Sequence, residues 1–249
     1  MPDKPGQGWY VYGVVESTVE VVPGRVGLAG AEVDLVHDKR IAALVSNIDL
    51  DRPIGTPEDL RAHKELLDAT AADAPVLPFR FGAVLESRQG VLDELLEPHD
   101  DEFADALRDL DGKAQYVVRA RYIEQAVLRE ILAENPKAAK MREKIGPEPD
   151  ASTRNLQIQL GEMINTAVEA KRDRDTSVMV ETLEPVTVTL NIRPPTHELD
   201  AAHIAFLERI DQHSDVEDAL TDLAESWSER AQTRLLGPMA AYDFVVTTQ

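Results

Sequence analysis

The 249-residue chain offers few side chains whose type and spacing could do chemistry, and the best of them are histidines beside carboxylates. The nearest approach to a metal-binding pattern is His197-Glu198 followed by Asp200 and His203. Zinc sites need several ligands at set spacings, as in H-E-x-x-H, and that motif is absent from the sequence. His203 falls on the apolar stripe of a predicted helix. We therefore interpret it as a packing residue and predict no metal site.

A second candidate is the glycine-rich stretch at residues 24–30, because glycine lets a backbone approach a phosphate closely. Its spacing matches neither G-x-G-x-x-G nor a phosphate loop with its lysine. The sequence also has no cysteine and no serine in a G-x-S-x-G turn. We interpret the glycines as a turn, expect no cofactor and no catalytic residue, and predict that the protein is not an enzyme.

Charge excludes several classes of partner. The chain has 26 basic and 46 acidic side chains and a formal net charge of −20 at pH 7, and negative charge repels phosphate backbones and anionic lipid surfaces. We therefore expect neither nucleic acid nor a membrane as a partner. No apolar run approaches the roughly 20 residues that span a bilayer, and residues 1–6 lack the apolar core of a signal peptide. These features predict a cytoplasmic protein.

The first half of the chain predicts an α+β layer. The expected elements are strands at residues 8–15, 32–37 and 40–46, a helix from Pro57, a strand at 76–81, and helices at 87–97 and 100–110 divided by Pro98. Thr56 is a candidate N-cap, with Pro57 at the first helical position. The apolar stripe of this helix contains Leu60, His63 and Leu67, so we assign His63 a structural role.

The second half predicts a further sheet with helices. Its expected elements are a strand at 113–122, helices at 123–133 and 136–145, a breaker-rich segment at 146–150, a long helix capped by Ser152, strands at 176–183 and 186–193, helices at 199–210 and 215–227, and strands at 230–236 and 242–247. We predict two α+β domains, residues 1–112 and 113–249, with a helical insertion at 123–175. Each is expected to hold a small mixed or antiparallel sheet with helices packed on it, ferredoxin-like or related.

The segment at residues 76–82 has a pattern suited to an interaction surface. Proline gives no amide hydrogen to a ladder, so Pro78 confines the strand to a sheet edge or a bulge. Alternation places Leu77, Phe79 and Phe81 on one face, which most simply packs on helices, and turns Arg80 toward the surface. An edge can accept a strand from another protein. The predicted partner-binding residues are Leu77, Pro78, Phe79, Arg80, Phe81 and Gly82.

Four segments in this order resemble the gas vesicle GvpF/GvpL family. They are the opening Tyr10-Val11-Tyr12-Gly13-Val14-Val15, the strand Ala42-Ala43-Leu44-Val45-Ser46, the core Leu77-Pro78-x-Arg80-Phe81-Gly82, and the late Gly237-Pro238 followed by Tyr242-x-Phe244-Val245. The last segment departs from the family pattern, which usually carries Trp-Pro-Pro-Tyr-Ser-Phe after Gly-Pro. The resemblance spans nearly the whole chain.

The resemblance implies a two-domain, non-catalytic accessory protein of gas vesicle assembly. It implies binding of the hydrophobic shell subunit GvpA in a chaperone-like or nucleation role, contacts with other accessory Gvp proteins, and for some members a place as a minor component of the vesicle. A large negative charge fits a partner that keeps an apolar subunit dispersed. The alternative is a regulatory module that binds a small metabolite at the junction of its two domains.

Overall fold

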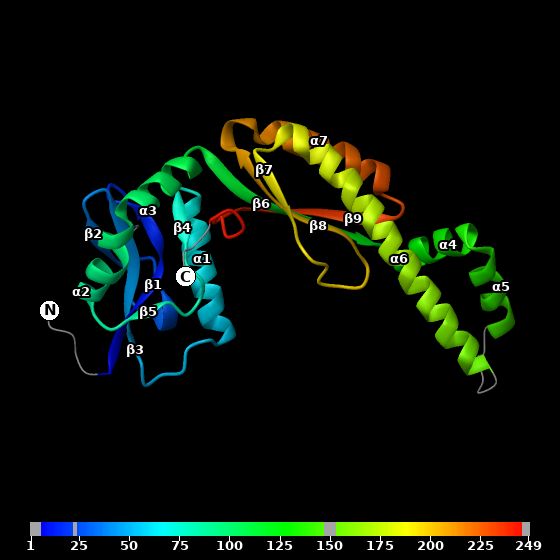
Figure 1. Ribbon diagram of the computed structural model, residues 1–249, viewed down its shortest axis with the longest axis horizontal. Coiled ribbons are helices and arrows are strands. Elements are labelled where there is room, and N and C mark those ends of the chain that lie inside the picture. Colours follow the sequence, from blue (N-terminus) through cyan, green and yellow to red (C-terminus); the bar gives the residue numbers. More distant parts are fainter. Residues whose placement is uncertain (1–5, 22–23, 147–152, 246–249) are drawn as a thin grey trace. The chain divides into compact units, whose positions relative to one another are not determined.

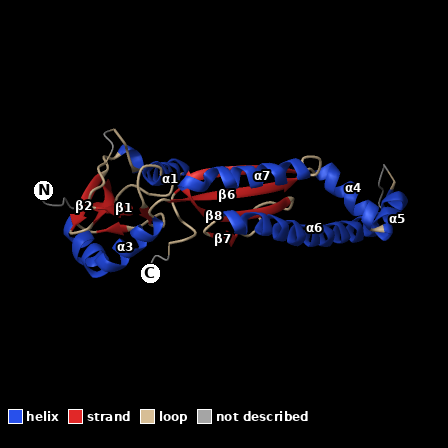
Figure 2. Cartoon of the chain, turned by 90° about the horizontal axis from the view of Figure 1, so that it is seen from above, coloured by secondary structure: helices blue, strands red, loops and turns tan. Residues whose placement is uncertain are grey.

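The computed structural model describes residues 6–21, 24–146 and 153–245. The chain divides into two compact units, each a sheet with helices packed on it (Figures 1 and 2). Unit 1 comprises Met1–Tyr116, Leu207–Asp211 and Gly237–Gln249, and unit 2 comprises Val117–Phe206 and Gln212–Leu236. The predicted α+β class is confirmed. Within the described residues, no helix has the length and apolarity needed to cross a membrane.

Unit 1 is built around a five-stranded sheet. Its elements are β1 (Gln7–Glu16), the short helix η1 (Leu28–Gly30), β2 (Asp34–Asp38), β3 (Ile41–Asp49), α1 (Pro57–Ala71), β4 (Val76–Pro78), β5 (Val84–Leu85), α2 (Arg88–Gly90), the π-helical turn η2 (Val91–Leu96) and α3 (Glu97–Leu110). The strand order is β2-β3-β1-β4, and β5 also pairs with β1. The predicted hairpin is confirmed as β2 and β3, which are antiparallel.

A β-bulge changes which residues of β1 face each of two hydrophobic cores. The register with β3 shifts between Val11 and Gly13, and an extra residue in one strand moves the alternation of side chains by one. Val11 and Val14 therefore face the core that contains α3, whereas Tyr12 and Val15 face the core that contains α1. We call these the α3-side core and the α1-side core. The sheet is consequently buried on both faces.

Pro98 does not divide two helices, and this prediction was wrong. The chain is helical without a break from α2 through η2 into α3, and Pro98 lies in the first turn of α3. Upstream, the Glu97 amide bonds to the Leu92 carbonyl five residues back, in the wider spacing of a π-helix. The helix therefore departs from regular α spacing directly before a proline, which has no amide hydrogen to continue that pattern.

Unit 2 contains the second sheet and the longest helix. The elements that lie wholly or partly in it are β6 (Lys113–Tyr122), α4 (Glu124–Glu134), α5 (Pro136–Ile145), α6 (Arg154–Leu183), η4 (Glu184–Val186), β7 (Thr189–Ile192), β8 (Asp200–Arg209), η5 (Ile210–Gln212), α7 (His213–Trp227) and β9 (Ala231–Met239). The strand order is β7-β8-β6-β9. Helices α6 and α7 contact each other and run alongside the strands (Figure 2).

Three predictions in the second half were wrong. Residues 176–183 continue α6, because Met179 and Leu183, four residues apart, are buried and extend its apolar stripe past the β-branched residues. Residues 199–210 form mostly β8, a central strand buried on both faces, whose near-continuous apolar sequence imitates a buried helix. Residues 242–244 form a turn. Ser152 and residues 147–150 and 246–247 lie outside the described residues.

Candidate partner-binding surface

The structure places Pro78 at an edge of the unit 1 sheet. Strand β4 is the last in the order β2-β3-β1-β4, and Pro78 lies opposite Gly13 of β1. The predicted edge position is confirmed, but the strand ends at Pro78 and not at Phe81. Leu77 is 1% exposed and Pro78 is buried. Neither side chain is therefore accessible to a partner.

Residues 79–82 leave the sheet as a loop that β1 holds at both ends. The Phe79 amide donates to the Tyr12 carbonyl (2.8 Å), and the Val11 amide donates to the Ala83 carbonyl (2.9 Å). We call these residues the 79–82 loop. Its backbone is fixed at two points on one strand, so the loop keeps a defined shape at the sheet edge.

The two phenylalanines of the 79–82 loop face different cores, which corrects the predicted alternation. Phe79 packs on the α3-side core, with its ring edge-on to Phe103 at a centroid distance of 6.1 Å. Phe81 packs on the α1-side core, 5.8 Å from the Tyr10 ring. Period-two alternation applies only while the chain is a strand, and the turn after Pro78 carries Phe81 across.

A buried histidine ties this loop to α1. Nε2 of His63 lies 3.2 Å from the Phe79 carbonyl, and Nδ1 lies 2.9 Å from the Tyr10 hydroxyl, which accepts the Gly82 amide at 3.1 Å. Because a carbonyl can only accept, Nε2 carries the hydrogen and Tyr10 donates to Nδ1. Burial lowers the pKa of His63 and outweighs the opposing effect of the Phe79 carbonyl. The neutral ring thus satisfies every contact, and its predicted structural role fits this position.

Two positions of the loop remain open to a partner. Arg80 and Gly82 are exposed, whereas Phe79 and Phe81 are half-buried. Gly82 has φ +100°, a conformation that a residue with a side chain rarely adopts. The loop therefore presents one exposed cation in the same segment as two half-buried phenylalanines.

Residues that follow β9 pass around this edge of the sheet. Ala240 belongs to the α1-side core and its neighbour Ala241 to the α3-side core. In Figure 1 the red segment after β9 runs beside β4 and α1. The Ala240 amide donates to Asp68 of α1 (3.1 Å), and the Asp243 amide donates to the side-chain oxygen of the fully buried Gln115 (3.0 Å). The chain itself therefore occupies the space beside β4.

The glycine-bearing loop at residues 24–30 is fixed by Tyr12. The Tyr12 hydroxyl accepts the Leu28 amide (2.8 Å) and donates to the Ser46 hydroxyl (3.0 Å). A Cβ built at Gly27 would lie only 1.9 Å from that hydroxyl oxygen, so this position requires glycine. The third glycine, Gly30, has φ +75° and meets nothing within 4 Å.

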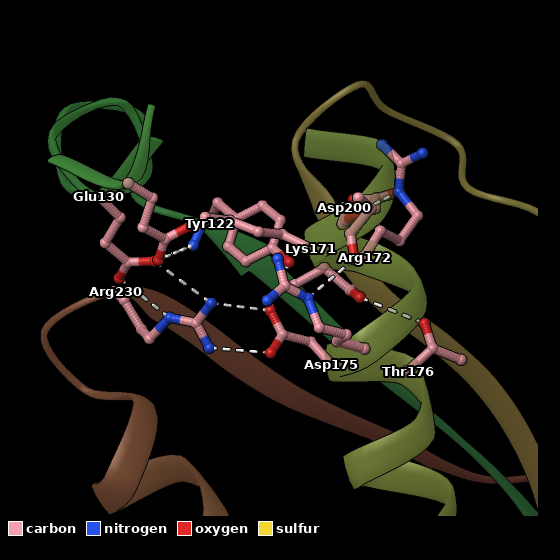
Figure 3. Close-up of polar contacts among 12 residues, drawn as sticks. Tyr122, Glu130, Lys171, Arg172, Asp175, Thr176, Asp200 and Arg230 are labelled. Carbon is pink, nitrogen blue, oxygen red and sulfur yellow. Dashed lines mark hydrogen bonds and ion pairs between the residues drawn. The ribbon is translucent and has the colours of Figure 1, made fainter. Parts of the chain in front are cut away.

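Unit 2 contains a cluster of charges that the sequence analysis missed (Figure 3). Lys171 of α6, 5% exposed, pairs with Glu130 (3.0 Å) and Glu134 (2.8 Å) of α4. Arg230 pairs with the same Glu130 (3.1 Å) and with Asp175 of α6 (2.8 Å). These contacts join α4, α6 and the residue that precedes β9.

An aromatic hydroxyl completes this cluster. Tyr122 of β6 donates to Asp175, and burial followed by this hydrogen bond raises the pKa of Tyr122, so it stays protonated. Asp175 and the other carboxylates are all paired, and the arrangement braces the unit without offering a reactive group. Glu130 and Glu134 are four residues apart, as are Lys171 and Asp175, and this matching spacing is the signal that could have found them.

The predicted histidine candidates do not converge on a metal site. His203 lies on β8, not on a helix, and its Nδ1 contacts the Pro194 carbonyl at 3.1 Å. Nδ1 of His197 accepts the Leu199 amide. Asp200 is buried and accepts from Thr196 at 2.8 Å. In the described part of the chain, no three potential ligands gather as a metal would require.

Known proteins share this sequence and fold along almost the whole chain. The family model for "Gas vesicle synthesis protein GvpL/GvpF" matches residues 8–246. Gas vesicle protein F of a Streptomyces species is 30% identical over 241 residues, which cover 95% of this chain and 98% of that protein. Gas vesicle protein F of Dolichospermum flosaquae is 22% identical, with 94% and 96% covered.

Solved structures agree on the fold. The crystal structure of GvpF from Anabaena sp. PCC7120 superposes with a TM-score of 0.77 at 19% identity, covering 98% of this chain and 100% of that one. GvpF from Microcystis aeruginosa gives 0.74 at 19% identity, covering 95% and 98%. With the family match across residues 8–246, these findings show that the chain belongs to the GvpL/GvpF family of gas vesicle proteins.

Proposed function

We propose that this protein is a non-catalytic accessory factor that binds the hydrophobic gas vesicle shell subunit, GvpA, and keeps it dispersed until it joins a growing vesicle. Its membership of the GvpL/GvpF family supports a role in gas vesicle formation. A shell subunit exposes apolar surface before it assembles, and a partner with a net charge of −20 opposes aggregation of the complex.

The observation that carries this proposal is the 79–82 loop. Its backbone is held by β1 at both ends, and His63 fixes it from α1. A segment that is already ordered loses little conformational freedom when it binds. In the proposed complex the exposed Arg80 supplies a polar contact, and the half-buried rings of Phe79 and Phe81 supply apolar contacts.

The buried members of the predicted site act indirectly. Leu77 and Pro78 fix the point at which the chain leaves the sheet and do not touch a partner. Because residues 240–245 already pass beside β4, a partner that added a strand there would have to displace them. We therefore propose that the shell subunit contacts the side chains of the 79–82 loop and does not extend the sheet.

Two further parts of the function are proposed from the family. The protein acts in the cytoplasm before assembly and at the vesicle during it, and it contacts other accessory Gvp proteins. Both follow from a role that begins with a soluble shell subunit and ends at a vesicle.

Co-expression with the shell subunit tests this function. We expect the soluble fraction of the shell subunit to rise when the protein is present, and a tag on the protein to recover both chains. A shell subunit whose solubility and recovery are unaffected would refute the proposal. Turnover of a substrate by the purified protein would refute its non-catalytic part.

A further inference from the structure

Three arginines gather on one face of the unit 2 sheet, in a chain whose net charge is −20. Arg119 and Arg121 are two residues apart on β6 and therefore share one face of the sheet. Arg234 lies on the neighbouring strand β9. Together with Gln232 and Leu236 they line a hollow of about 230 Å³. Positive charge is therefore concentrated around this hollow.

This face is opposite the one that packs on α6. Tyr122 of β6 points to Asp175 of α6 (Figure 3), and successive side chains of a strand point to opposite faces, so Arg119 and Arg121 point away from that helix. Leu236 is 51% exposed beside them. The hollow is thus accessible from solvent.

The arginines keep donors that the described residues do not satisfy. Nε of Arg121 donates to the Asp200 carboxylate (3.1 Å), but the Arg121 side chain is still 43% exposed. Arg119 donates to Thr196, while its Nε is shielded from solvent and has no partner in the described residues. The exposed Arg234 guanidinium makes no hydrogen bond or ion pair with any described residue. The donors that an incoming oxyanion could reach are therefore those on the exposed guanidinium groups of Arg121 and Arg234.

We propose that this hollow binds the carboxylates of an acidic segment of a partner protein, with Leu236 in contact with an apolar side chain of the same segment. Guanidinium groups present several donors in a planar fork that matches a carboxylate. A nucleic acid fits less well, because its phosphates repeat along an extended backbone whereas these arginines line one hollow of about 230 Å³. This inference does not depend on the contact proposed for the 79–82 loop.

Fluorescence anisotropy of a labelled peptide with ten glutamates and one central leucine tests the site in the full chain. We expect binding at low ionic strength that weakens as salt is added. Arg234→Glu reverses an exposed, unpaired charge and should weaken binding at least about tenfold. Arg142→Glu, on an exposed residue of α5, changes the net charge equally and should retain the affinity of the unmodified protein. Melting curves of both variants check that the fold is intact.

Four outcomes would overturn the proposal. Absent binding, or an equal loss in Arg234→Glu and Arg142→Glu, would show that no local site exists. An oligonucleotide that competes more strongly than the peptide and depends on Arg234 would assign the hollow to nucleic acid. A change in sedimentation caused by Arg234→Glu alone would assign it to a second copy of this chain.

Discussion

The hydroxyl of Tyr10 donates to Nδ1 of His63 across 2.9 Å and accepts the Gly82 amide at 3.1 Å. One hydroxyl thus connects a strand, a helix and the loop at the sheet edge. A hydrogen on Nδ1 would remove the bond that Tyr10 now donates, because the hydroxyl hydrogen would have to turn away from the ring. The position of the 79–82 loop is therefore linked to the protonation state of His63.

Stability should fall as the pH drops through the range of this histidine. Burial lowers the pKa of His63 below its ordinary value of 6.5, so below that pH the unfolded chain binds a proton before the folded chain does. Folding is consequently weakened as the pH falls. His63→Gln keeps one hydrogen for Phe79 and one acceptor for Tyr10 but does not titrate. Urea unfolding at about pH 7.5 and about pH 5.5 should show a smaller loss in this variant than in the unmodified protein.

The matched control is His37→Gln, because His37 is exposed. This variant should retain the full loss of stability between the two pH values. If the unmodified protein and His63→Gln lose the same free energy of unfolding, the buried imidazole is not the group responsible.

Gly13→Ala should destabilise unit 1 by about 1–3 kcal/mol, the usual cost of forcing atoms into a packed site. A Cβ at this position would lie 2.5 Å from the Leu77 carbonyl oxygen, so β4 would have to move away from β1. Urea denaturation measures the change. Gly161→Ala, in α6 with nothing within 4 Å, should instead stabilise by about 0.5–1 kcal/mol. Equal effects of the two substitutions would contradict this packing.

Asp175→Asn should cost about 3 kcal/mol, because it leaves Arg230 in a partly buried place without its closest carboxylate. It also weakens the acceptor for Tyr122. Thermal unfolding followed by circular dichroism would show the loss. The control is Asp105→Asn, whose partner Arg108 is equally exposed at 67%, and which should leave the melting curve unchanged. A melting curve of Asp175→Asn that matches the control would contradict a bracing role.

Arg80→Glu should weaken binding of the shell subunit at least about tenfold while the melting temperature stays nearly constant. Arg80 is exposed, so the fold does not depend on it. Phe79→Asp should instead unfold unit 1, because it places a charge against the α3-side core. Arg61→Glu, on the exposed surface of α1, is the control for net charge. Normal binding by a folded Arg80→Glu protein would exclude the 79–82 loop as the contact.

Local signals in the sequence predicted the elements that local interactions decide. Thr56 caps α1 as expected: its hydroxyl accepts the Asp59 amide, the Asp59 carboxylate accepts the Thr56 amide, and Pro57 begins the helix. The strand at residues 8–15 and the hairpin after it were also predicted, because aromatic and β-branched residues and a charged turn mark them directly. The edge position of β4 followed from one proline.

The features that were missed depend on partners distant in the sequence. Leu60 was placed on the buried stripe of α1 but is 49% exposed, because the sheet covers Leu66 instead. Phe81 lies in the α1-side core because its ring packs against the rings of Tyr10 and His63 there. The pairing of Arg230 with Glu130 joins residues 100 positions apart, and no local pattern indicates it.

The path of residues 240–245 has a consequence for synthesis on the ribosome. Ala240 and Ala241 complete hydrophobic cores whose other members begin with Tyr10 and Val11. Strand β1 must therefore wait for residues 240 and 241 to be translated before its surroundings are finished. During that interval the nascent chain exposes apolar surface that the finished fold covers.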